Sequence, residues 1–298
     1  MNAGSRPTGG CAARDLPRCV FQSAPVRARA RIHHNGDMTP PLATALLLAT
    51  LLGAGPLDDL ARDRAGNRAG DGEVPAVDPT PMSAYATRDM RGWTVRVHPA
   101  LSAEPELCAA VLEELDHQLY AIERAVPAVA VERLRAIPIW AELETPKTAC
   151  MCYHVSRDWL VPNGYLAEKE RSVEIGNARA FLEWTHQQPW MVLHELAHGF
   201  HDQVYGYDHA EITAAWRRAG ASGTLEEVAH ISGRPGRHYA LTNQMEWFAE
   251  STEALFGTND FFPFVRAELR TLDPEGAALV ERLWREPPAD PGRADQPE

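Results

Sequence analysis

The sequence WMVLHELAH, residues 190–198, places two histidines and a glutamate inside an apolar segment. His194 and His198 are four residues apart, so on a helix they project from one face, about 6 Å apart, and both can bind one Zn²⁺ at roughly 2.0–2.1 Å. Glu195 then lies beside the metal without coordinating it, where it can take a proton from a metal-bound water. Because burying three such side chains is costly unless they are satisfied, we predict a zinc site on a buried helix.

A zinc site of this kind needs a third protein ligand. His201 lies about 10.5 Å from His194 along a helix axis, which is too far to complete the same site. Val204 stands where the metzincin pattern requires histidine, which excludes that class. The motif EWFAE, from Glu246 to Glu250, puts two carboxylates on one face of an otherwise apolar helix. One can bind the metal, and the other can accept a hydrogen bond from the outer nitrogen of a ligand histidine.

The pair of motifs resembles a known family. HELAH followed 48 residues later by Glu-x-x-x-Glu is similar to the gluzincin metallopeptidases, and in particular to the catalytic domain of anthrax toxin lethal factor and its relatives. In that group a tyrosine precedes the ligand glutamate by seven residues, with Thr-Asn between them, as in YALTNQME here. The resemblance covers about residues 170–260. It implies that Glu246 is the third ligand and that Tyr239 stabilises the transition state. It also implies that Glu250 does not bind the metal itself but contacts and orients the ligands.

The resemblance also implies a mechanism, in which one Zn²⁺ per chain activates a water for attack on a peptide bond. Glu195 acts as general base and later delivers the proton to the leaving amine. His238 competes with Tyr239 as the donor to the oxyanion, but we expect it to be an exposed loop histidine. In gluzincins the edge strand before the zinc helix pairs with an extended substrate, which makes Asn177 and Ala178 candidate substrate-binding residues.

Two other functions fit the same motifs. The chain can be a non-catalytic zinc-binding domain that interacts with a partner, or an amidase that acts on a non-peptide or cell-wall amide. Glu195 and Tyr239 favour an enzyme, since a structural zinc site needs neither and usually closes with four protein ligands. The expected partner of the peptidase is a peptide or protein substrate.

The first 81 residues do not look like part of the folded domain. Residues 42–52, LATALLLATLL, match the apolar core of a secretory signal peptide and are too short to span a bilayer. We therefore expect a leader over residues 1–55, with Met38 as a plausible alternative start, and a secreted or extracytoplasmic protein. Residues 159–163 and 260–264 also resemble a family of secreted proteins with this same core. Residues 56–81 read as a flexible linker.

Residues 82–286 have the pattern of one α+β domain, and the resemblance implies a zincin-like fold in which a small mixed sheet packs on the active-site helix and on a second, ligand-bearing helix. Alternation and periodicity predict strands over 93–98, 137–143 and 172–175, and helices over 105–126, 188–204, 211–218, 242–256 and 274–285. Thr242 is the expected N-cap of the second ligand-bearing helix. The tail, 287–298, is expected to be disordered.

Composition excludes some functions. The formal net charge of −12 argues against a nucleic-acid binder, because nothing here would neutralise many phosphates. No segment is long and apolar enough to span a membrane. After removal of the leader, Cys108, Cys150 and Cys152 leave either one disulfide and a thiol or no disulfide. His154, two residues after Cys152, is expected to be structural.

Overall fold

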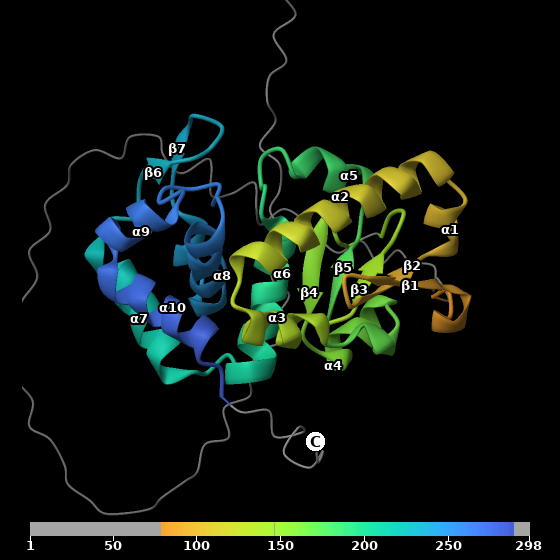
Figure 1. Ribbon diagram of the computed structural model, residues 1–298, viewed down its shortest axis with the longest axis horizontal. Coiled ribbons are helices and arrows are strands. Elements are labelled where there is room, and N and C mark those ends of the chain that lie inside the picture. The colour runs from red at the N-terminus through yellow and green to blue at the C-terminus, as the bar shows by residue number, and fades with distance from the viewer. Residues whose placement is uncertain (1–78, 146, 289–298) are drawn as a thin grey trace, which may run out of the picture. The chain divides into compact units, whose positions relative to one another are not determined.

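The computed structural model describes residues 79–145 and 147–288, which contain one five-stranded sheet, with helices α1–α4 between its strands and the other helices after them (Figure 1). The predicted leader, most of the linker and most of the tail lie outside the described residues. The strands of the sheet are β1 (Ala86–Met90), β2 (Trp93–Val97), β3 (Ile139–Ala141), β4 (Met151–His154) and β5 (Ser172–Ile175). The helices are α1 (Pro99–Ser102), α2 (Pro105–Ala125), α3 (Ala128–Arg135), α4 (Arg157–Leu160), α5 (Ala178–Trp184), α6 (Met191–Phe200), α7 (Ala210–Ser222), α8 (Gln244–Phe256), α9 (Arg266–Leu272) and α10 (Pro274–Arg285).

The strand order of the sheet is β1-β2-β3-β5-β4. Strands β2, β3 and β5 are parallel, while β1 and β4 are antiparallel to their neighbours and form the two edges. Strand β5, which leads to Asn177, therefore has a partner on each side. The expectation that this strand is an edge is wrong, because Met151–His154, which the sequence pattern did not predict as a strand, pairs along its outer side.

One face of the sheet is apolar and holds the core. Val95, Ile139 and Val173 are in register across the three parallel strands and are fully buried. Helix α2 crosses in front of the strands in Figure 1, α3 contacts β2 and α6, and α6 packs against β4 and β5. Each fully buried aliphatic side chain of this kind contributes roughly 1.5–3 kcal/mol. The core thus fixes α6, the predicted zinc helix, directly against the sheet.

Helix α6 lies between the sheet and α8, and two glycines permit its close packing (Figure 1). A Cβ on Gly199 would lie 2.7 Å from Ile137 Cδ1 and 3.0 Å from Tyr153 Cε2, both on the sheet side. A Cβ on Gly257, just after α8, would lie 2.0 Å from the ring of Trp190, which is the N-cap of α6. The start of α6 and the end of α8 are therefore held in direct contact.

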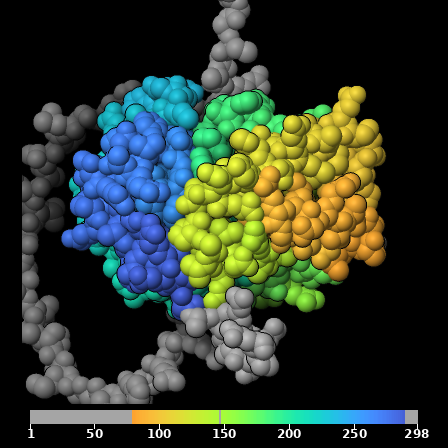
Figure 2. Space-filling model, viewed as in Figure 1, coloured from red at the N-terminus to blue at the C-terminus, as the bar shows by residue number. Residues whose placement is uncertain are grey.

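The C-terminal helices form the other side of the domain. Helix α8 packs against α7, α9 and α10, and α10 reaches back to α3. Figure 2 shows residues of these blue C-terminal helices beside the yellow-green residues of the α2–α3 region on one surface. A short hairpin of β6 (Val228–Ala229) and β7 (Pro235–Gly236) precedes α8.

The predicted α+β class is confirmed, and the boundaries of β5 and α10 match the predicted ones. Helix α6 begins at Met191 rather than 188, and residues 201–205 continue it as a π-helical turn. Thr242 is not the N-cap of α8. Asn243 takes that place, and its Oδ1 accepts hydrogen bonds from the backbone N–H of Met245 and of Glu246, each at 2.9 Å. Among the described residues, no helix is both long enough and apolar enough to cross a bilayer.

Candidate metal centre

Helices α6 and α8 bring the two predicted motifs together. His194 and His198 lie on the face of α6 that meets α8, with ring centroids 4.7 Å apart and nearly perpendicular planes. Glu246 comes from the first turn of α8, where the Asn243 cap fixes its backbone. His198 and Glu246 are each almost fully buried. The two segments, far apart in the sequence, therefore present three metal-ligating groups to one point.

The distances fit a shared metal ion. Glu246 Oε2 lies 3.2 Å from His194 Nε2 and 3.4 Å from His198 Nε2. Two ligand atoms at about 2.0–2.1 Å from one tetrahedral Zn²⁺ are separated by about 3.4 Å. These three side chains form one of the groups of the described residues that can hold a metal ion. The other carboxylate oxygen of Glu246, Oε1, is buried without a hydrogen-bond partner among the residues that the structure describes, which is costly unless a cation compensates it.

The charges of Glu246, His194 and His198 shift one another's pKa values. Burial would raise the pKa of Glu246, but the neighbouring His198 and His194 outweigh it and lower that pKa to about 2. Burial would lower the pKa of His194, but its hydrogen bonds to Glu246 and Glu253 raise that pKa well above 6.5. Glu246 is therefore held as a carboxylate, which is the form that binds a metal.

The outer nitrogen of His194 is held by Glu253 rather than by Glu250. Nδ1 of His194 donates to Glu253 Oε1 at 2.7 Å, whereas Glu250 Oε1 lies 4.0 Å away. The sequence pattern predicted a supporting role for Glu250 and did not identify Glu253, which is the carboxylate that accepts from His194. The sequence spacing could have identified Glu253, because residues 246, 250 and 253 follow the i, i+4, i+7 spacing of one helix face. The carboxylate of Glu250 instead lies 3.6 Å from Nδ1 of His238.

Glu195 and Tyr239 line a small cavity in front of His194. Burial, followed by the charge of Glu246, raises the pKa of Glu195 to about 8, against the opposing effects of His194 and of the backbone N–H of Tyr153. Helix α6, which carries Glu195, packs against edge strand β4. Tyr239 opens the 3-10 turn Tyr239–Leu241 just before α8 and borders the same cavity.

His201 and His238 are both buried. His201 is fully buried at the C-terminal end of α6, against the rings of Tyr207 and Phe248, and burial lowers its pKa to about 3. It lies outside the ligand group, as the helix rise predicts. His238 is 2 % exposed, so the expectation of an exposed loop histidine is wrong. Its Nδ1 accepts from the backbone N–H of Ala240 and caps the turn that carries Tyr239.

Asn177 and Ala178 have structural positions. The side chain of Asn177 caps α5 by accepting from the N–H of Ala180 at 2.9 Å. The backbone N–H groups of Asn177 and Ala178 donate to Cys150 and Leu143 respectively, and Ala178 is fully buried. Their backbone donors are already used within the protein, so these residues do not offer a free strand edge to a substrate.

Comparison of the chain with protein-family models, with curated proteins and with solved structures finds no match in any of the three.

Proposed function

We propose that the protein is a secreted zinc-dependent metallopeptidase. The observation that carries the proposal is the meeting of Glu246 with both histidines of the HELAH motif, at 3.2 and 3.4 Å. Two imidazoles and one carboxylate are the ligand set of catalytic zinc sites that keep a fourth position open. A mixed sheet whose antiparallel edge strand runs beside the motif helix supports the zincin-like fold implied by the resemblance.

His194, His198 and Glu246 would hold the metal, and the orphaned, buried Oε1 of Glu246 supports that assignment. A zinc ion there would supply a Lewis acid and lower the pKa of a water from about 15.7 toward 7. Glu253 fixes the tautomer and the ring orientation of His194 through the bond to Nδ1. One zinc per chain is the expected content of this centre.

Glu195 is the proposed general base and acid. It lies next to the metal ligands but its carboxylate is not one of them, and burial raises its pKa above that of an ordinary glutamate, as suits a group that both takes and returns a proton. Tyr239 borders the same cavity, where its hydroxyl can donate to the oxygen that becomes negative during attack on a carbonyl. A well-placed donor of this kind contributes about 3–4 kcal/mol to transition-state stabilisation.

Strand β4 is the proposed binding edge for an extended peptide. Among the described residues it pairs only with β5, so its other side is not used by another strand of the sheet. Helix α6, which carries Glu195, packs against β4, so this edge runs beside the helix of the proposed reacting group. A substrate added as a further strand would gain main-chain hydrogen bonds with little dependence on its sequence.

The test is hydrolysis by the purified full-length protein, loaded with zinc, of casein and of a peptide library. Cleavage should stop with a chelator and return with zinc. Glu195→Gln should retain zinc and lose cleavage. As a matched control we choose Glu183→Gln, because Glu183 is exposed on α5 and does not line the cavity at Glu195, so this variant should retain full activity.

Other results would select the rival functions or reject the centre. Retention of zinc without cleavage of any peptide would favour a non-catalytic binding domain, and cleavage confined to cell-wall amides would favour an amidase. Cleavage that survives Glu195→Gln would reject the proposed mechanism. Failure to bind zinc would reject the site.

A further inference from the structure

The second face of the sheet carries a polar row that the proposed catalytic centre does not use. Arg96, Trp140, Glu174 and Cys152 are in register across β2, β3, β5 and β4. Side chains alternate between faces along a strand, so this row faces away from Val95, Ile139 and Val173 and their apolar core. His154 lies two residues beyond Cys152, on the same face. Three residue types that bind metals therefore meet at the β4–β5 pair.

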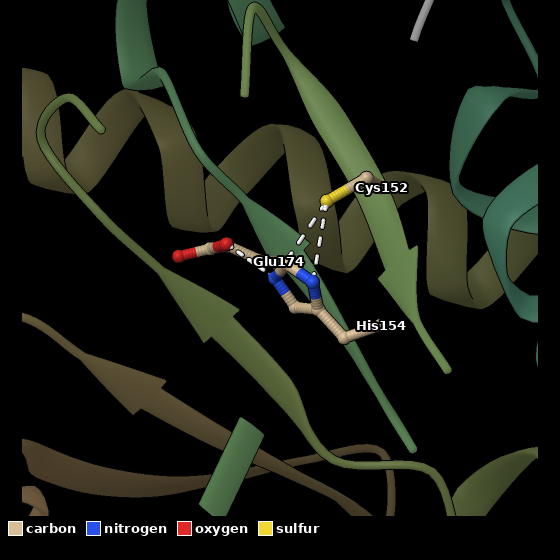
Figure 3. A group of neighbouring side chains, drawn as sticks. All are labelled: Cys152, His154 and Glu174. Carbon is tan, nitrogen blue, oxygen red and sulfur yellow. Dashed lines mark hydrogen bonds and ion pairs between the residues drawn. The ribbon is translucent and has the colours of Figure 1, made fainter. Parts of the chain in front are cut away.

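The ligand atoms of Cys152, His154 and Glu174 are close together. They all lie within 4.8 Å of one another, and Figure 3 shows the imidazole between the thiol and the carboxylate. His154 Nε2 is 3.7 Å from the sulfur of Cys152 and 2.5 Å from Glu174 Oε2. Among the described residues the cysteines are thiols, so the sulfur is not consumed in a disulfide.

The arrangement approaches the geometry of a zinc site. With Zn–S of about 2.3 Å and Zn–N of about 2.0–2.1 Å, a tetrahedral ion separates sulfur and nitrogen by about 3.6 Å, close to the 3.7 Å observed. The nitrogen and the carboxylate oxygen would need to move apart by about 0.9 Å, from hydrogen-bond contact to the separation that a shared ion imposes. Binding of an ion therefore requires a shift of Glu174 Oε2 away from His154, while Oε1 keeps its bond to Lys169.

The charges around the cluster also favour a cation. Glu174 and Glu142 are both buried, and both accept from the single ammonium of Lys169, which leaves one formal negative charge. With the thiolate of Cys152, the two carboxylates and the ammonium sum to −2, which a divalent ion balances. Lys169 bonds to Oε1 of Glu174, so it leaves Oε2, the oxygen that faces His154, for the ion.

The cluster is covered but can be reached. Trp159 stacks over the imidazole of His154 at 6.4 Å between centroids, and Tyr165 packs at 5.3 Å. These rings hold the imidazole in place from the α4 side of the sheet. Cys152 is partly exposed, which gives an ion a route to the sulfur.

We propose that Cys152, His154 and Glu174 form a second divalent-metal site, of the zinc type, on the face of the sheet opposite α6. A thiolate, an imidazole and a carboxylate are each established zinc ligands, and a water can take the fourth position. The ion would cross-link the edge strand β4, through Cys152 and His154, to Glu174 on β5. This site stands on its own residues and does not depend on the proposed peptidase activity.

The test is to load the purified full-length protein with Co²⁺ and to record the near-ultraviolet charge-transfer absorption that thiolate-to-Co²⁺ bonding produces. The HELAH centre contains no cysteine, so the band reports the second site alone. Cys152→Ser should lose the band and one of two bound metal ions. Cys150→Ser is the matched control, because Cys150 lies two residues away, bonds to Met191 and should leave the band unchanged. His198→Ala should also keep the band while losing the other ion.

Each outcome is decisive for this site. Absence of the band in the unmutated protein, or a band of full intensity in Cys152→Ser, would overturn it. A single bound ion whose band disappears in Cys152→Ser would support it and would count against the HELAH centre. A single bound ion without the band would overturn the second site and would support the HELAH centre. Circular dichroism confirms that each variant is folded.

Discussion

Nδ1 of His194 donates to the carboxylate of Glu253 at 2.7 Å, while Nε2 of the same ring faces Glu246 at 3.2 Å. The imidazole is thus fixed from both sides by carboxylates that lie seven residues apart on α8. A carboxylate behind a ligand histidine sets its tautomer and raises its basicity toward a metal. This relationship makes α8 both the source of a ligand and the support of another.

Glu253→Gln should weaken zinc binding by about 10- to 100-fold, because the amide is a poorer acceptor for Nδ1–H than the carboxylate. Competition with a chelator of known affinity measures the change. Glu250→Gln is the comparison variant, since Glu250 lies 4.0 Å from the same nitrogen. A larger loss in Glu250→Gln than in Glu253→Gln would contradict the assignment.

Tyr239→Phe should lower kcat by about 10²- to 10³-fold and change KM little, because the lost hydroxyl serves the transition state rather than the bound substrate. Steady-state kinetics on a peptide cleaved by the unmutated protein measures both constants. Tyr120→Phe is the control, since Tyr120 is 46 % exposed on α2, away from the centre. Equal activity of Tyr239→Phe and Tyr120→Phe would exclude Tyr239 from catalysis.

Lys169→Met should destabilise the fold by about 3–5 kcal/mol, because it leaves two buried carboxylates without their shared cation. Lys169 is 3 % exposed and bonds to Glu142 at 2.6 Å and to Glu174. The other lysine, Lys147, is exposed and bonds to Asn163, so Lys147→Met should change stability by less than about 0.5 kcal/mol. Urea unfolding compares the two, and equal midpoints would refute this account of the network.

Gly257→Ala should cost about 1–3 kcal/mol of stability and reduce zinc affinity, because the added methyl would push Trp190 and the start of α6 away from α8. Thermal unfolding and metal titration measure the two effects. Gly220→Ala is the control on α7, where the nearest side-chain atom to a new Cβ is 4.0 Å away. There the substitution should be neutral or stabilising by up to about 1 kcal/mol, because alanine is the better helix former. No difference between the variants would show that the Trp190 contact is adaptable.

The sequence alone determined the elements that carry the metal ligands. Periodic apolar residues predict α6 and α8, and the i, i+4 spacing puts His194 and His198 on one face, because the rise and turn of a helix are fixed. The same local rules predict β5 and α10 with their observed bounds. They do not predict β4, whose four residues MCYH lack an alternating pattern and become a strand by pairing with β5.

Only the tertiary structure decided which groups from different elements meet. That Glu253 rather than Glu250 binds His194 depends on the rotation and offset of α8 against α6, which side-chain packing across the interface sets. Cys152 and His154 gain a carboxylate partner through the register of β4 with β5, and a one-residue shift would turn both to the other face. Local sequence fixes which side chains lie on one face of each helix or strand, while long-range packing fixes the distances on which metal binding depends.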